Sequence, residues 1–198
     1  MKRLALGAFA WLALAAGAAA QPVINEFVAN HVGIDTNEYA EGFATPFADL
    51  SAYSIIEIEG EGTTARGLVD DFIQNLTAAD ANGIWWSGFT NNLLENGTLM
   101  LLLVSDLTAV TPNVSDIDTN DDGVIDTTFW SEIVDSVAVF DGGAGELTYS
   151  SVVLDMSLPP AGFPPGGASR IPNGTDTDSV SDWRRNDFDG AGIPGFTG

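Results

Sequence analysis

The sequence feature that most constrains the fold is the run GTLMLLLV at residues 97–104, the most apolar stretch outside the N-terminal segment. The run is bounded by Gly97 and Ser105. It has the length of a strand, since buried strands span about four to eight residues whereas helices need about ten or more. Because the apolar residues are continuous rather than alternating, both faces of this strand are expected to be buried.

Short β-type runs separated by turn residues occupy most of the remaining chain, as is typical of a β-sandwich. They lie at residues 21–29, 37–43, 50–59, 67–74, 84–86, 133–140 and 147–154. The last two flank a DGGAG turn at residues 141–145 and are predicted to pair as a hairpin. Beyond Leu158 the chain becomes rich in Pro and Gly. The pattern predicts an all-β sandwich of about seven to eight strands.

The first twenty residues have the layout of a signal peptide. Lys2 and Arg3 precede an apolar core, and small residues at 18–20 fit the cleavage subsites. The stretch is short for a membrane span and has no basic flank after it. The sequence therefore predicts a signal peptide at 1–20, one domain at 21–198, and a secreted (extracellular or periplasmic) protein without a membrane span in the mature chain.

Composition excludes several classes of site and partner. The chain has no cysteine, so disulfides, zinc–thiolate sites and thiol nucleophiles are absent. Of its six basic residues, removal of Lys2 and Arg3 leaves four arginines against 28 acidic residues, which is a formal charge of −24. Direct nucleic-acid binding is not expected, because phosphate contacts need clustered Lys and Arg. Calcium or cationic partners are compatible with this charge.

The strongest chemical signal is the acidic segment DIDTNDDGVID at residues 116–126. With Asp118 as position 1 of a calcium loop, the following alternate positions supply oxygen ligands, and Gly123 stands where such loops turn sharply. The predicted ligand set for a structural Ca²⁺ is Asp116, Asp118, Asn120, Asp122, Val124 (through its carbonyl) and Asp126.

The loop departs from an EF-hand at its twelfth position, which is Phe129 rather than a bidentate Glu. Glu132, Asp135 or Asp116 could supply the missing ligand. The alternative is a solvated turn with no metal, because Asp, Asn and Gly favour turns for their own reasons.

No set of residues forms a recognisable active site, so the chain is not expected to be an enzyme and no catalytic residue is assigned. His31 is the only histidine, and no serine lies in a G-x-S-x-G elbow. Trp85, Trp86 and Trp183 could form a carbohydrate platform, but alternation along a strand favours a core position for Trp85 or Trp86 and an outward position for its neighbour. Arg184 and Arg185 are expected to neutralise Asp182, Asp187 and Asp189.

Several short motifs together resemble the lamin-tail domains of bacterial secreted proteins. They are VINEFVAN at 23–30, NEYAE at 37–41, DLSAYSIIEIEG at 49–60, the runs GTLMLLLV and SVAVFDG, and the terminal ASRIPN…DW…IPG, in that order. The chain departs from the family pattern at Ala52, where a Gly is usual, and in the acidic insertion around Asp118.

The resemblance implies an immunoglobulin-like β-sandwich that acts as a non-catalytic module. It implies no catalytic residues. We therefore expect a secreted binding or structural module, stabilised by calcium, whose partner is an extracellular protein or glycan. Two alternatives remain at this point: an accessory domain of a secreted nuclease or phosphatase, and a carbohydrate-binding β-sandwich that uses Trp85 or Trp86.

Overall fold

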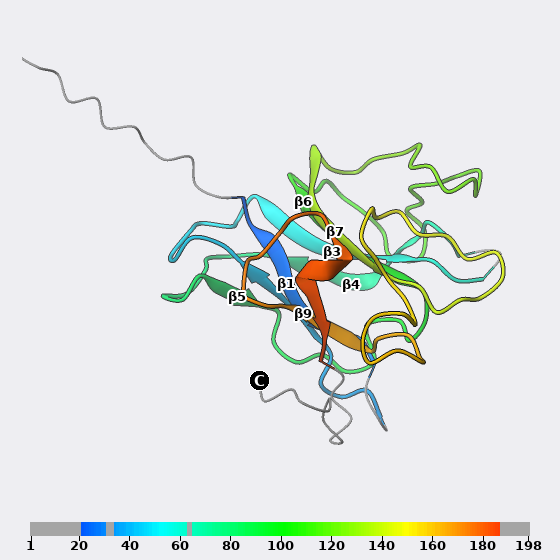
Figure 1. The fold of residues 1–198 in the computed structure, drawn as a ribbon. Helices are drawn as coiled ribbons and strands as arrows, with labels where there is room; N and C mark the ends of the chain where they lie inside the picture. Colours follow the sequence, from blue (N-terminus) through cyan, green and yellow to red (C-terminus); the bar gives the residue numbers. More distant parts are fainter. Residues whose placement is uncertain (1–20, 31–33, 63–64, 187–198) are drawn as a thin grey trace, which may run out of the picture.

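A computed structural model describes residues 21–186 except for 31–33 and 63–64 (Figure 1). The predicted signal peptide, His31 and the last twelve residues therefore lie outside the described residues. The described part contains no α-helix, only one 3-10 turn, η1 (Val180–Asp182). It holds no helix that is long and apolar enough to span a membrane.

Within the described residues, ten strands form two five-stranded sheets that pack face to face. The first sheet has the order β10-β9-β1-β2-β5, with β10 (Trp183–Arg185), β9 (Gly167–Arg170), β1 (Val23–Val28), β2 (Tyr39–Phe43) and β5 (Ile84–Trp86). The second has the order β4-β3-β6-β7-β8, with β4 (Val69–Asn75), β3 (Tyr53–Glu59), β6 (Leu99–Ser105), β7 (Glu132–Val139) and β8 (Val153–Leu154). The predicted all-β sandwich is confirmed.

The central strand β6 explains why two layers form. Leu99, Leu101 and Leu103 face the first sheet and join the main core, while Met100, Leu102 and Val104 face the opposite side. All six side chains are essentially inaccessible to solvent. The prediction of a strand buried on both faces is confirmed.

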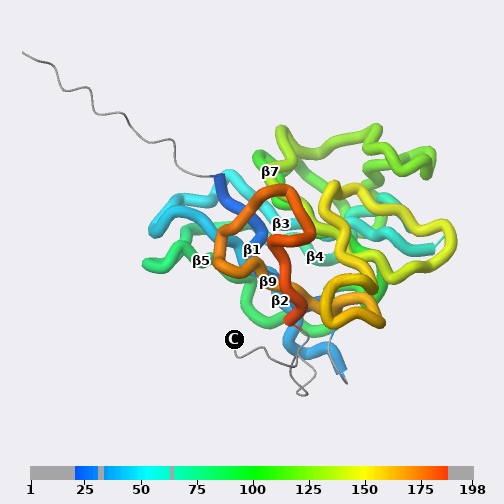
Figure 2. The backbone as a smooth tube through the Cα atoms, in the orientation of Figure 1, coloured from blue at the N-terminus to red at the C-terminus, as the bar shows by residue number. Residues whose placement is uncertain are grey.

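The outer face of the second sheet is covered by the long segment between β6 and β7. Ile117 and Trp130 from this segment pack on Ile58, Met100 and Leu102 to form a second core. In Figure 2 this segment lies as a green loop beside the second sheet. The acidic run is therefore attached to a hydrophobic layer at its base, through Ile117 and the buried Asp118, while most of its other residues are exposed.

Two expectations about strands were wrong. The 147–154 segment does not form a hairpin with β7, since β8 pairs with β7 in parallel, Ala138 opposite Val153. Leu147 instead donates its backbone N–H to Gly60, so the chain continues past the end of the sheet before it returns. The count of seven to eight strands was also too low, because the Pro/Gly-rich C-terminal region supplies β9 and β10 to the first sheet.

A buried arginine joins the two sheets. Arg170 of β9 is fully buried and places its Nη2 atom 3.0 Å from each carboxylate oxygen of Asp135 on β7. Its Nε atom donates to the carbonyl of Ile24, and its guanidinium lies 4.6 Å from the ring centre of Trp183. Burial raises the pKa of Asp135 to about 6 against the opposing effect of Arg170.

Candidate functional site

The acidic loop, residues 116–126, has Asp118 at its base. Asp118 is fully buried, and its carboxylate accepts hydrogen bonds from the N–H of Gly123 at 2.7 Å, the N–H of Asp122 at 3.2 Å and the Tyr149 hydroxyl at 3.0 Å. Gly123 has φ +85°, which suits the sharp turn inferred from the sequence. Asp118 is therefore the anchor of the loop.

The other predicted ligands lie nearer the surface. Asp116 accepts the N–H of Asp118, Asn120 accepts that of Asp122, and Asp122 accepts that of Val124. Hydrogen bonds from Thr119 to Asp126 lower the pKa of Asp126. Most oxygens that the calcium prediction uses thus also accept hydrogen bonds from the loop itself, and calcium binding there stays a prediction.

The candidates for the missing calcium ligand lie in different environments. Asp135 is bound to Arg170 and to the N–H of Ile24. Glu132 is exposed at the start of β7. Among the described residues, the groups of three carboxylates whose oxygens lie within 4.8 Å of one another include no member of the acidic loop.

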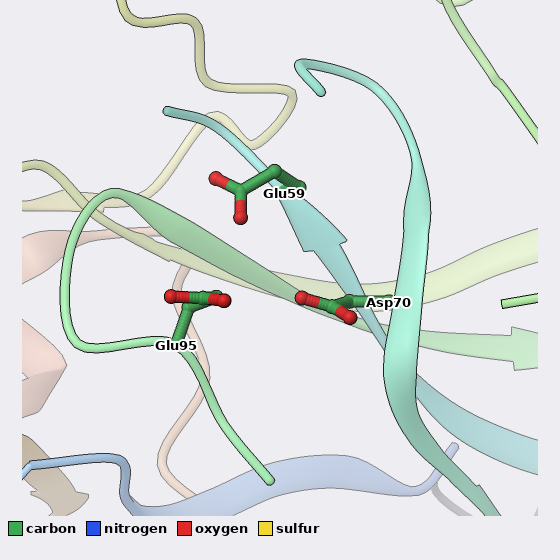
Figure 3. Close-up of side chains that lie close together, drawn as sticks. All are labelled: Glu59, Asp70 and Glu95. Atoms are coloured by element: carbon green, nitrogen blue, oxygen red, sulfur yellow. The ribbon is translucent and has the colours of Figure 1, made fainter. Parts of the chain in front are cut away.

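One of those groups was not found from the sequence. Glu59 at the end of β3, Asp70 on β4 and Glu95 in the connection from β5 to β6 direct their carboxylates toward a common space (Figure 3). Glu57, two residues before Glu59 on β3, is not one of these three, but its Oε1 atom accepts the backbone N–H of Glu95. We call these four residues the β3–β4 acidic cluster. Strand pairing brings β3 and β4 together, and Glu95 comes from the connection between β5 and β6, so no local motif marks these residues.

Burial is the main cause of the raised pKa values of Glu57, Glu59 and Glu95. Burial raises the pKa of Glu59 to about 7 and raises the pKa of Glu57 well above its ordinary value. It also raises the pKa of Glu95, with the charge of Asp70 as the next contribution. A carboxylate removed from water with other carboxylates around it favours its neutral form.

A second carboxylate group, Glu61, Asp141 and Glu146, lies where the β3–β4 and β7–β8 connections meet. Its members accept several hydrogen bonds. Glu61 accepts the N–H of Thr98, and Glu146 accepts the Thr98 hydroxyl and the N–H of Gly143. These bonds give the group a structural role at the end of the sandwich.

The two adjacent tryptophans of β5 point in opposite directions, as alternation predicts. Trp85 belongs to the main core, whereas Trp86 is 51 % exposed. Phe89, 59 % exposed, lies edge-on to Trp86 at a centroid distance of 5.3 Å, and Tyr39 contacts both rings. We call Tyr39, Trp86 and Phe89 the aromatic surface. Trp183, by contrast, is fully buried.

Carboxylates border the aromatic surface. Trp86 lies directly opposite Glu41 on β2, and Glu41 lies opposite Glu26 on β1, so all three share the outer face of the first sheet. The Tyr39 hydroxyl donates a hydrogen bond to Glu26, and Asn25 donates one to Glu41 at 2.7 Å. Burial raises the pKa of Glu41. Rings and hydrogen-bond acceptors are thus presented together.

The adjacent arginines do not pair as expected with Asp182, which lies 3.5 Å from Arg170. Arg185 is buried and donates to the carbonyls of Leu158 and Phe163, while Arg184 donates to that of Ser181. Asp187 and Asp189, their other expected partners, lie outside the described residues.

The described chain is an all-β sandwich protein with an acidic loop, a buried group of carboxylates and an exposed aromatic surface. Comparisons of the sequence with known protein families and curated proteins, and of its fold with solved structures, found no match. The lamin-tail resemblance therefore rests on the sequence motifs.

Proposed function

We propose that this chain is a secreted, non-catalytic binding module of the lamin-tail type, with the aromatic surface as its ligand-binding face. The observation that carries the proposal is the pair of exposed rings, Trp86 and Phe89, held edge to face on the outer side of a sandwich sheet. A large exposed apolar group held by neighbouring rings is typical of a contact surface, because burying it in a complex removes it from water.

The chemistry around the rings favours a hydroxyl-rich ligand, which makes carbohydrate the ligand class we propose. The apolar face of a sugar ring can stack on Trp86 or Phe89. Glu26 and Glu41 stand on the same face of the sheet, where carboxylates can accept hydrogen bonds from hydroxyl groups. A chain with 28 acidic residues repels anionic polymers, so a neutral or cationic glycan fits better than an anionic one.

We propose a structural calcium ion in the acidic loop as part of the same function. The turn at Gly123 and the buried anchor Asp118 hold the loop in one conformation. The oxygens of Asp116, Asn120, Asp122 and Asp126 and the carbonyl of Val124 alternate along it, which is the arrangement that a hard divalent ion uses. The ion would stabilise the loop over the second core and take no part in ligand binding.

The test is a screen of the mature protein against neutral, basic and acidic glycans, followed by Trp86→Ala and Phe89→Ala. We expect binding to a neutral or basic glycan that each substitution weakens about tenfold or more, since buried aromatic anchors carry much of the energy of an interface. Val114→Ser, at a 69 % exposed apolar residue associated with the other sheet, should leave binding unchanged. Absence of binding to every glycan, or binding unaffected by both aromatic substitutions, would refute the carbohydrate assignment.

A further inference from the structure

The β3–β4 acidic cluster has the geometry of a second cation site. Glu59, Asp70 and Glu95 each offer a carboxylate oxygen, and these oxygens all lie within 4.8 Å of one another (Figure 3). Oxygens on opposite sides of a Ca²⁺ ion stand about 4.6–5.2 Å apart, because each lies about 2.3–2.6 Å from the metal. The three oxygens can therefore bind one ion with little movement.

The side chain of Glu57 gives a second, independent indication of a cation site. Its side chain is fully buried, and its Oε1 atom accepts the N–H of Glu95 at 2.8 Å. Its Oε2 atom is buried and has no hydrogen-bond partner among the residues that the structure describes. Glu57 and Glu59 lie two residues apart on β3 and so share one face of the strand, and Oε1 of Glu57 contacts the backbone of Glu95, which places this side chain next to the three carboxylates. A buried carboxylate oxygen without a partner is costly, and a bound cation would satisfy it.

In the described part of the chain, no basic side chain forms an ion pair with the carboxylates of the cluster. Arg66 pairs with Asp121, and Arg170 pairs with Asp135, Asp176 and Asp182. None of these ion pairs involves a member of the cluster. Four acids on three segments are thus brought together without a cationic side chain among them, which is destabilising unless a cation or protons neutralise them.

We propose that Glu57, Glu59, Asp70 and Glu95 bind one divalent cation of the hard, oxygen-preferring class, with Ca²⁺ as the preferred ion. The site is separate from the acidic loop. Glu57, Glu59 and Asp70 form its buried wall, and the exposed Glu95 leaves one side open to water, which completes the coordination. Mg²⁺ fits less well, since its shorter bonds would require the oxygens to move together.

The bound ion would connect three parts of the sandwich. Glu59 ends β3, Asp70 lies on β4, and Glu95 belongs to the connection that begins after Trp86 and includes Phe89. The cation is therefore expected to fix this connection against the second sheet. This consequence does not depend on any ligand of the aromatic surface.

The test uses metal-free mature protein, titrated with CaCl₂ by calorimetry and followed by thermal unfolding. Asp122→Ala serves as the background, because it removes a predicted ligand of the acidic loop and leaves the β3–β4 acidic cluster intact. In this background we expect one Ca²⁺ to bind and to raise the melting temperature. Absence of binding up to millimolar Ca²⁺ would show that the cluster is neutralised by protons alone and would overturn the proposal.

Substitutions in the same background locate the ion. Glu57→Gln and Asp70→Asn keep the side-chain shape and should each weaken Ca²⁺ binding tenfold or more. Asp71→Asn is the matched control, since Asp71 is the exposed neighbour of Asp70 on β4. This variant should bind Ca²⁺ with the same affinity as the Asp122→Ala protein. Unchanged affinity in both cluster variants would place the ion elsewhere. If one variant fails to fold, the other still decides the outcome.

Discussion

The acidic loop and the β3–β4 acidic cluster gather the same residue types by different routes. In the loop, the acids are neighbours in sequence, and backbone N–H groups of the loop itself donate to them, as Gly123 and Asp122 do to Asp118. In the cluster, the acids come from three separate segments, and within the described chain Glu57 Oε2 has no donor. The pKa values differ accordingly. Hydrogen bonds from Thr119 lower the pKa of Asp126, while burial raises the pKa of Glu59 to about 7. Local donors stabilise negative charge, whereas burial among other acids opposes it.

The largest expected effect comes from removing the anchor of the loop. Asp118→Ala leaves the Gly123 N–H, the Asp122 N–H and the Tyr149 hydroxyl without their acceptor. We expect the free energy of unfolding to fall by about 2–4 kcal/mol and the melting temperature by roughly 5–15 °C. Denaturant and thermal unfolding in a chelator measure this without any contribution from calcium.

Asp121→Asn is the control for that experiment. Asp121 is exposed, its side chain forms an ion pair with Arg66 at 3.5 Å, and its φ of +56° is a conformation that Asn tolerates. Its substitution should change stability by less than about 1 kcal/mol. A loss equal to that of Asp118→Ala would mean that the charge of the loop, rather than its anchor, determines stability.

Calcium binding at the loop should have the next largest effect. Binding to the folded form raises the free energy of unfolding by about 2.7 kcal/mol when free Ca²⁺ is 100 times the dissociation constant. This corresponds to a rise in melting temperature of roughly 5–10 °C. In a Glu57→Gln background, which weakens the other proposed site, Asp122→Ala should abolish the rise and Asp71→Asn should preserve it. A calcium response that survives Asp122→Ala in this background would leave the loop as a metal-free turn.

The metal-free protein should lose stability as the pH rises, because of the β3–β4 acidic cluster. The pKa of Glu59 is about 7 in the folded protein and ordinarily 4.5, so the folded state retains a proton that the unfolded chain has lost. The resulting stabilisation is complete below about pH 4.5 and disappears as the pH rises through about 7.

The measurement is the melting temperature in a chelator between pH 5 and pH 8. We expect a fall of roughly 3–6 °C, with Asp135, whose pKa is raised to about 6, contributing in the same range. Glu59→Gln should reduce the fall, whereas Asp71→Asn should not. A melting temperature that stays constant or rises over this interval would contradict the raised pKa values.

The comparison also shows which parts of the molecule could be predicted from the sequence. The continuous apolar run of β6, the alternation that buries one of the two adjacent tryptophans and exposes the other, and the sharp turn at Gly123 are local patterns, and each is found as predicted; the structure adds that Trp85 is the buried one. The parallel pairing of β8 and the addition of β9 and β10 to the first sheet depend on contacts with distant segments. The high Pro and Gly content of the C-terminal region therefore did not predict that it contains strands.

The same distinction applies to the candidate sites. The acidic run at 116–126 is visible in the sequence because its members are adjacent. The β3–β4 acidic cluster is not, since Glu59 and Asp70 meet through strand pairing and Glu95 arrives from the next connection. One signal was available: Glu57 and Glu59 alternate with isoleucines in a strand whose two faces are buried. An acidic residue at a buried strand position indicates a group that neutralises it or donates a hydrogen bond to it, but the sequence does not identify that group.

The smallest expected effect is the change in free energy of unfolding when an acid is replaced by its amide, measured in a chelator at pH 8. This change should have opposite signs in the two regions. Asp118→Asn should destabilise the protein, because an amide replaces a carboxylate oxygen that accepts hydrogen bonds from Asp122, Gly123 or Tyr149. Glu57→Gln should stabilise it by about 1 kcal/mol, since the amide keeps the acceptor for the Glu95 N–H and adds donors toward the neighbouring carboxylates.

The Glu57→Gln substitution is also expected to weaken Ca²⁺ binding. A gain in metal-free stability together with a loss of calcium response is a result that simple structural damage cannot produce. If Glu57→Gln lowers metal-free stability as Asp118→Asn does, the carboxylate of Glu57 is already satisfied in the fold and the contrast between the two regions fails.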